Sequence, residues 1–186
     1  MKKYLLLIIA AALLLSGCGM KGGPAAPAET PQVQEITPEP TPDPYIEVIS
    51  ENNDYGYLLK DIDGDGTEEL LFATRTGNIS EDQIIRAMYS KDGGEAYEVF
   101  RSDERSCYYL CADGTIVNEV NNSVYSWSVT DYEFSGGSLV QRHSVVMDMT
   151  SDRYNPYSVD GETREENEAI GTANSYKEQY IKILPD

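Results

Sequence analysis

The chain has 186 residues, with 14 lysines and arginines against 32 aspartates and glutamates, so its formal net charge is −18. A chain with this balance has no basic surface that could displace counterions from phosphates, which excludes a typical nucleic-acid-binding protein. The length leaves room for one domain with a modest core after the unusual N-terminal part is set aside.

The first 17 residues have the organisation of a secretion signal. Two lysines form a positively charged start, and the apolar run 4–15 that follows is too short to span a bilayer comfortably. The run ends in Leu-Ser-Gly-Cys at positions 15–18, which resembles the bacterial lipobox. That resemblance implies that Cys18 carries diacylglycerol and becomes the first residue after cleavage. The alternatives are an ordinary signal peptide with a chance cysteine, or a short membrane anchor.

Loss of the signal would leave 12 basic and 32 acidic residues, a net charge of −20. Anionic lipid headgroups repel such a chain, so we expect contact with the membrane only through the diacylglycerol anchor. The expected location is the outer face of the cytoplasmic membrane, lipid-anchored on its extracellular side.

Residues 18–44, which begin at the lipidated cysteine, are rich in proline. Seven of the nine prolines lie here, and proline removes amide donors and favours an extended backbone. Large apolar side chains are almost absent, so the region cannot bury a core. We expect a tether that, at about 3.1 Å per residue, reaches roughly 80 Å. The alternative is a proline-rich docking motif.

Residues 45–186 are predicted to form a single globular domain of the mainly β (α+β) class. Fourteen tyrosines against one tryptophan and three phenylalanines favour half-buried strands, because tyrosine has an apolar body and a polar tip. Short runs separated by turn residues predict an antiparallel β-meander of about eight short strands with a C-terminal helix packed on it. The expected strands are 55–60, 68–75, 84–90, 96–101, 106–111, 115–120, 124–134 and 138–149.

The expected helices lie at the two ends of this domain. Residues 45–53 predict a short helix. Thr163 and Glu166 have the spacing of a capping box, which predicts a helix from there through Ile170, weakened by Gly171. Residues 181–184 are expected to form a final extended segment.

The acidic loop, residues 61–69, reads Asp-Ile-Asp-Gly-Asp-Gly-Thr-Glu-Glu. Asp61, Asp63 and Asp65 stand at alternate positions, and in a tight turn their carboxylates can converge on one hard cation. Without a cation their mutual repulsion is unfavourable. Oxygen ligands without histidine or cysteine select Ca²⁺ over zinc or copper. The alternative is a polar hairpin turn that binds no metal.

An EF-hand loop would need a glutamate at its twelfth position, where this chain has Phe72. The pattern Asp-x-Asp-x-Asp-Gly-x-x-Glu instead resembles the calcium loops of integrin-type and FG-GAP-like repeats, which lie in β-hairpins. The resemblance implies five metal ligands: the side chains of Asp61, Asp63 and Asp65, the backbone oxygen of Thr67, and Glu69. We expect weak, structural Ca²⁺ binding, with a Kd on the order of 10⁻⁴–10⁻³ M.

The wider stretches 57–71 and 107–116 look like a group of uncharacterised lipoproteins of clostridia and related Gram-positive bacteria. The similarity covers most of residues 55–186, and it is specific in the acidic loop and loose elsewhere. It implies a lipid-anchored protein of the cell envelope and no particular activity.

Aromatic residues on the predicted sheet are candidates for a contact surface, since aromatic rings stack on sugars and anchor interfaces. The partner would be a glycan, a wall polymer or another envelope protein. The alternative is that these rings belong to the core. The candidate surface residues are Tyr108, Tyr109, Tyr125 and Trp127.

Other reactive side chains have ordinary structural interpretations. Cys107 and Cys111 would lie about 13 Å apart on one strand, beyond the reach of a disulfide, so we expect two free, half-buried thiols. His143, the single histidine, is expected on the surface of a strand. The chain has no Gly-x-Ser-x-Gly elbow, Ser-x-x-Lys pair, zincin helix or phosphate-binding loop.

These observations predict a cell-surface lipoprotein whose calcium-stabilised domain is a binding or structural module of the envelope, and we do not expect an enzyme. One alternative is a glycan-directed hydrolase that uses acidic pairs such as Asp103–Glu104 or Glu165–Glu166. Another is an accessory solute-binding lipoprotein, against which the small size and the lack of βα alternation argue.

Overall fold

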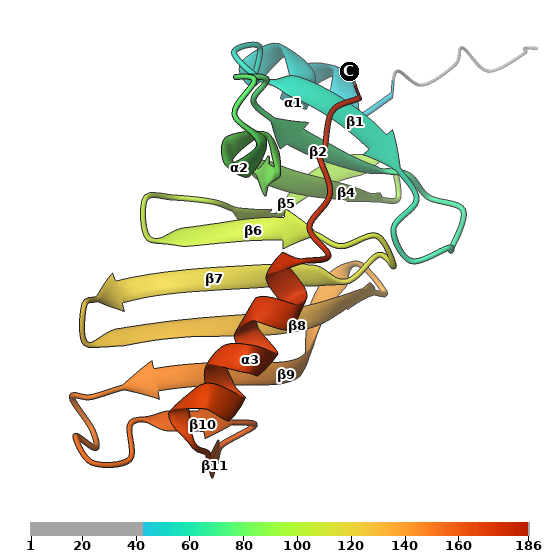
Figure 1. Cartoon of the computed structure of the whole chain (residues 1–186). Coiled ribbons are helices and arrows are strands. Elements are labelled where there is room, and N and C mark those ends of the chain that lie inside the picture. The colour runs from blue at the N-terminus through green and yellow to red at the C-terminus, as the bar shows by residue number, and fades with distance from the viewer. Residues whose placement is uncertain (1–42, 186) are drawn as a thin grey trace, which may run out of the picture. The chain divides into compact units, whose positions relative to one another are not determined.

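The computed structural model describes residues 43–185 (Figure 1). The predicted signal peptide, Cys18 and the predicted tether up to residue 42 lie outside the described residues. Within residues 43–185 the predicted mainly β class is confirmed, with three helices and eleven strands in two antiparallel sheets. No helix in this part of the chain is long and apolar enough to cross a membrane.

The smaller sheet has the strand order β1-β2-β4-β5. Its strands are β1 (Gly56–Lys60), β2 (Glu69–Ala73), β4 (Ala87–Asp92) and β5 (Glu95–Arg101). The acidic loop joins β1 to β2, and Lys60 pairs with Glu69 at the base of that hairpin. The predicted hairpin setting of the acidic loop is therefore confirmed.

The larger sheet has the order β11-β10-β9-β8-β7-β6-β3. Its strands are β3 (Ile84–Ile85), β6 (Ser106–Leu110), β7 (Ile116–Ser123), β8 (Ser126–Ser135), β9 (Ser138–Asp148), β10 (Tyr157–Val159) and β11 (Glu162–Thr163). The consecutive hairpins β6 to β9 form the predicted meander. The short strands β10 and β11 are additional to the eight predicted ones.

The chain crosses between the sheets at Arg86. The sequence predicts one strand over 84–90, but Ile85 pairs with Tyr108 in the larger sheet and Ala87 pairs with Phe72 in the smaller one. The Arg86 amide donates to the Phe72 carbonyl at 2.7 Å, which fixes the point of crossing. A single apolar run thus supplies two strands because each half is buried in a different sheet.

Strand β2 is buried along its whole length. Leu71 and Ala73 point into the core cluster that joins the two sheets, and Leu70 and Phe72 point into a second cluster beneath helix α1 (Tyr45–Glu51). Burial on both faces explains why the sequence here is a continuous apolar run instead of an alternating one. The Tyr45 hydroxyl donates to the Glu68 carbonyl at 2.8 Å and holds α1 beside the acidic loop.

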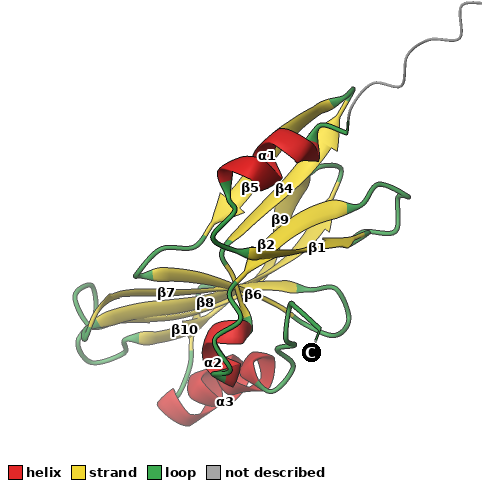
Figure 2. Cartoon of the chain, turned by 90° about the horizontal axis from the view of Figure 1, so that it is seen from above, coloured by secondary structure: helices red, strands yellow, loops and turns green. Residues whose placement is uncertain are grey.

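Helix α3 (Glu166–Lys177) packs on one face of the larger sheet, whereas α1 covers the smaller sheet (Figure 2). Ala169 and Ala173 contact the valines of β7, β8 and β9 in a third core cluster. Tyr176 donates to Asp131 at 3.0 Å, and Tyr180, just after the helix, donates to Glu119 at 2.9 Å. Burial and these carboxylates raise the pKa of both tyrosines, so both hydroxyls stay protonated donors.

The predicted capping box is wrong. Thr163 lies in β11, and the helix begins after Glu165, which makes no side-chain cap bond. Strand pairing of Thr163 with Ser158 removes its hydroxyl from the helix start. The predicted final segment 181–184 is not a strand but an irregular stretch with bends, and it buries Ile183 and Leu184 in the core between the sheets. Helix α2 (Ile79–Asp82) was not expected from the sequence.

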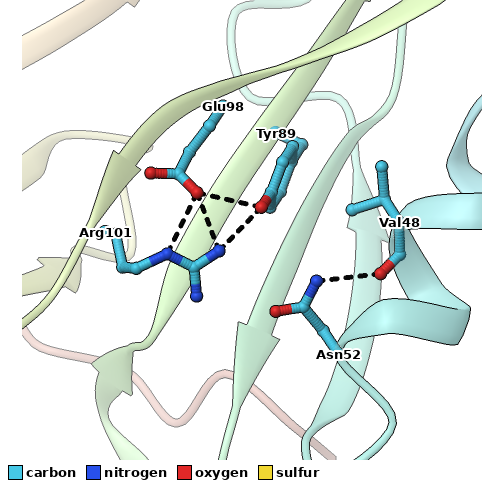
Figure 3. A network of polar contacts seen from close by, with 5 residues as sticks. All are labelled: Val48, Asn52, Tyr89, Glu98 and Arg101. Carbon is cyan, nitrogen blue, oxygen red and sulfur yellow. Dashed lines mark hydrogen bonds and ion pairs between the residues drawn. The ribbon is translucent and has the colours of Figure 1, made fainter.

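The outer face of the smaller sheet carries a polar network (Figure 3). Arg101 contacts the Glu98 carboxylate at 2.7 Å and the Tyr89 hydroxyl at 2.7 Å, and Tyr89 donates to Glu98 at 2.9 Å. The Glu98 carboxylate raises the pKa of Arg101. Nearby, Asn52 closes α1 by donating to the Val48 carbonyl at 2.9 Å. Each of these groups has its partner in the network, which we therefore interpret as structural.

Candidate metal site

The acidic loop folds by bonding its own aspartates to its backbone. Asp61 accepts from the Gly64 amide at 2.7 Å and from the Gly66 amide at 3.0 Å. Asp63 accepts from the Asp65 amide at 3.2 Å. Gly64 and Gly66 have φ angles of 77° and 91°, a left-handed conformation that glycine adopts without strain. Aspartates and glycines at alternate positions therefore build a compact turn.

This turn brings the carboxylates of Asp61, Asp63 and Asp65 together, with one oxygen of each within 4.8 Å of the others. Asp61 and Asp63 are half-buried, and Asp65 is exposed. Three converging carboxylates could hold a metal ion, and an all-oxygen donor set suits a hard cation. The structure does not identify the ion.

Glu69 occupies a different position from the three aspartates. Its side chain is 1% exposed, and it accepts from the Ile62 amide at 3.0 Å and from the Ser90 hydroxyl at 3.2 Å. Burial raises the pKa of the Glu69 carboxyl, the two hydrogen bonds oppose that shift, and the charges of Asp63 and Asp65 add to it. Glu69 thus anchors the start of the acidic loop to β4, and no oxygen of it belongs to the three-aspartate group.

Thr67 donates its amide to Asp65 at 2.6 Å, which continues the pattern of turns. Its backbone oxygen as a ligand stays a prediction, as does direct binding by Glu69. Sequence reasoning missed Ser90, which reaches Glu69 from β4. Only the antiparallel pairing of β2 with β4 makes that contact, and a polar residue inside a predicted strand gives no signal for it.

The acidic loop borders an open cavity of about 500 Å³. The opposite wall is formed by the turn at Asp113–Gly114 and by the β8–β9 hairpin, including Arg142. Asp63 and Asp65 line this cavity, so an ion bound by them would remain accessible from solvent.

The four aromatic residues predicted as a contact surface do not share one exposed face. Tyr108 stacks on Phe100 with ring centroids 4.0 Å apart and packs against the core between the sheets. Tyr109, on the other face of β6, stacks on Tyr180 at 4.2 Å. Only Tyr125 is well exposed, at 58%.

Trp127 is half-buried against the core cluster beneath α3. Two of the four rings therefore have structural stacking partners, and the alternative interpretation as core applies best to Tyr108 and Tyr109. Tyr125 lies in the exposed β7–β8 turn and Trp127 under the helix, so these two belong to different surfaces.

The expectation of two free thiols is confirmed, but Cys111 is buried, not half-buried, and it lies just past the end of β6. Cys107 and Cys111 are free, half-buried and buried respectively, and burial raises the pKa of the Cys111 thiol to about 11. An inert thiol is the consequence. His143 is exposed on β9 and contacts Asp160 at 3.0 Å.

The acidic pairs proposed for hydrolysis have local roles. Asp103 accepts from the Arg105 and Ser106 amides, which lowers its pKa, and Glu166 accepts from the Tyr157 hydroxyl at 3.0 Å. These bonds order a turn and the start of α3.

No protein-family model, curated protein or solved structure matches this chain. The resemblances drawn from the acidic loop and the lipobox therefore stay predictions.

Proposed function

We propose that this chain is a lipoprotein of the outer face of the cytoplasmic membrane, whose β-rich domain is a Ca²⁺-stabilised binding or structural module of the cell envelope. The observation that carries the proposal is the convergence of Asp61, Asp63 and Asp65 within 4.8 Å in the β1–β2 turn. The lipobox ending at Cys18 supports the anchor, and the proline-rich stretch supports a spacer between membrane and domain.

Calcium fits the site better than other common ions. The described residues around the turn offer oxygen atoms, and thiolate or imidazole ligands, which zinc prefers, are absent from the three-aspartate group. Mg²⁺ requires near-ideal octahedral geometry, whereas Ca²⁺ accepts the irregular arrangement that a short turn provides. The ion would relieve the repulsion among three carboxylates and so stabilise the β1–β2 hairpin, which forms one edge of the smaller sheet.

Thermal unfolding of the full chain in detergent tests the metal claim. Ca²⁺ at about 100 times its Kd would stabilise the fold by about 2.7 kcal/mol relative to chelator, and Mg²⁺ by less. Asp63→Ala would remove this response. Asp152→Ala is the matched control, because Asp152 also bonds to backbone amides of an exposed loop but lies outside the three-aspartate group. An equal Ca²⁺ response in both variants would refute the proposal.

A second experiment tests the anchor independently of the metal. In cells that express the full chain, Cys18→Ala would abolish incorporation of labelled fatty acid and reduce the fraction of the protein that sediments with membranes. Labelling of the Cys18→Ala chain at the wild-type level would contradict the lipid anchor and leave the metal claim unaffected.

A further inference from the structure

A second site lies where α3 meets the larger sheet. Towards its C-terminal end the helix leaves a cavity of about 270 Å³ against β7 and β8. Figure 1 shows α3 crossing in front of these strands. We call this cavity the helix pocket.

The helix wall of the pocket is one stripe. Ile170, Ala173, Asn174 and Lys177 follow the i, i+3, i+4, i+7 spacing, so they lie on the same side of α3 and line the pocket together. Ile170 is 36% exposed, which leaves an apolar edge open to solvent.

The sheet wall is formed by two neighbouring pairs of residues. Asn121 pairs with Trp127 across β7 and β8, and Glu119 pairs with Val129 two residues further along. Residues two apart on a strand share a face, so all four point toward α3. The indole of Trp127 thus forms the broad apolar surface of the wall, with a carboxylate and an amide beside it.

Several polar groups of the pocket lack a protein partner. Within residues 43–185, the side-chain amides of Asn121 and Asn174 and the indole N–H of Trp127 make no hydrogen bond. Glu119 and Lys177 are paired at 3.3 Å, and Glu119 also accepts from Tyr180, so this acceptor and this cation are held in place. The pocket combines a fixed ion pair with free amides that can each donate and accept.

We propose that the helix pocket binds a single pyranose ring of a neutral or N-acetylated sugar, stacked on Trp127. A pyranose has an apolar C–H face, which suits the indole, and a rim of hydroxyls, which suits free amides and a carboxylate. A volume slightly below the usual lower limit of about 300 Å³ for ligand pockets fits one ring. The net charge of −18 disfavours nucleotides, the other common ligands that stack on aromatic rings.

This inference rests on the proposed function, because it names the ligand class of the proposed binding module. It requires neither the acidic loop nor its ion to contact the sugar. The two proposals can therefore fail separately.

Fluorescence of the full chain in detergent tests the inference, since Trp127 is the only tryptophan and its emission reports on the pocket alone. The methyl β-glycosides of glucose and of N-acetylglucosamine are titrated in the presence of Ca²⁺. We expect a saturable change in emission with at least one of them, with a Kd on the order of 1 mM, as befits a small ligand.

Two asparagines of α3 provide a matched pair of variants. Asn174 lines the pocket, whereas Asn167 lies on the same helix outside it, and both side chains are exposed and without hydrogen bonds in the described part of the chain. Asn174→Ala should weaken sugar binding about fivefold or more, the effect of one lost hydrogen bond, while Asn167→Ala binds like wild type. Replacement of either exposed amide leaves the core intact.

Absence of saturable change with both glycosides overturns the inference, as does equal weakening by the two variants. Saturable change with adenosine but with neither glycoside would overturn it in favour of a nucleobase ligand. A Ca²⁺ response in thermal unfolding without a sugar response would refute only the helix pocket. A sugar response without a Ca²⁺ response would refute only the metal proposal.

Discussion

The charge of Asp63 should have opposite effects on stability with and without Ca²⁺. Asp63→Asn keeps the side-chain oxygen that accepts from the Asp65 amide at 3.2 Å, so the turn itself is preserved. The substitution removes one of the three charges that lie within 4.8 Å of one another, and with it two of the three pairwise repulsions.

The size of the effect follows from Coulomb's law. Two unit charges at this separation repel by about 0.9 kcal/mol in water, and physiological salt reduces that by about half. Two lost repulsions therefore stabilise the metal-free chain by about 1 kcal/mol. For a domain of this size, that corresponds to a rise in Tm of about 3 °C.

Calcium should reverse the order. Wild type gains about 2.7 kcal/mol at about 100 times Kd, and a variant that no longer binds the ion gains nothing. Wild type then exceeds Asp63→Asn by about 1.7 kcal/mol, or about 5 °C. The assay is thermal unfolding of both chains in chelator and in Ca²⁺. A variant that is less stable than wild type in chelator would refute the claim that the carboxylates repel one another in the folded turn.

Three further predictions concern Glu69, Gly171 and Tyr176. The raised pKa of Glu69 means that the folded chain binds this proton more tightly than the unfolded chain does, so without metal some stability is lost as the pH rises above about 4.5 and through the pKa of the folded chain. Glu69→Gln should flatten the dependence of the unfolding free energy on pH, measured by urea unfolding from about pH 4 to pH 8. An unchanged pH dependence would contradict this prediction. Gly171→Ala should stabilise the fold by about 1 kcal/mol in urea unfolding, because alanine favours a helix and the added Cβ meets no atom within 4 Å. Gly64→Ala should destabilise the fold, because the φ of +77° at this position is strained for any residue with a Cβ. Equal effects of the two substitutions would contradict the prediction. Tyr176→Phe should lower the unfolding free energy by about 1–3 kcal/mol, because the buried Asp131 carboxylate loses the hydroxyl that donates to it. Tyr154→Phe, at an exposed position, is the control. A smaller loss from Tyr176→Phe than from Tyr154→Phe would refute the claim that this hydrogen bond holds α3 on the larger sheet.

Local patterns predicted much of the fold. The runs that became β1, β2 and β5 to β9 are bounded by Gly- and Asp-rich turns, and they were correctly assigned as antiparallel strands. The division into two sheets could not be seen locally. Nothing in the run 84–90 marks the crossing at Arg86, because the crossing depends on which neighbour each half finds.

The capping box failed for a similar reason. Thr163 has the right spacing from Glu166, but pairing of β11 with β10 places it in a strand. The strand pairing, which depends on the tertiary structure, therefore outweighs the local helix-capping signal. Gly171, expected to weaken the helix, lies within α3 all the same, since Ala169 and Ala173 on either side of it are buried against the sheet.

At the candidate metal site, the convergence of the aspartates could be predicted from spacing alone. Alternate positions in a turn with glycines at 64 and 66 leave the carboxylates few other arrangements. The burial of Glu69 under Ser90 depends on strand order and could not be predicted. The helix pocket had a partial signal in the stripe from Ile170 to Lys177, but its second wall comes from residues some fifty positions earlier in the chain.

Calorimetric titration of Ca²⁺ into the full chain tests the central claim most directly. One binding site with a Kd on the order of 10⁻⁴–10⁻³ M is expected for wild type, and none for a chain in which Asp61, Asp63 and Asp65 are all asparagine. Asparagine keeps the one acceptor oxygen that the turn uses at Asp63 and at Asp65, and at Asp61 it keeps one of the two oxygens that accept from Gly64 and Gly66, so a lost signal would report chiefly on charge. Binding of equal strength in the two chains, or no binding in wild type, would contradict the account.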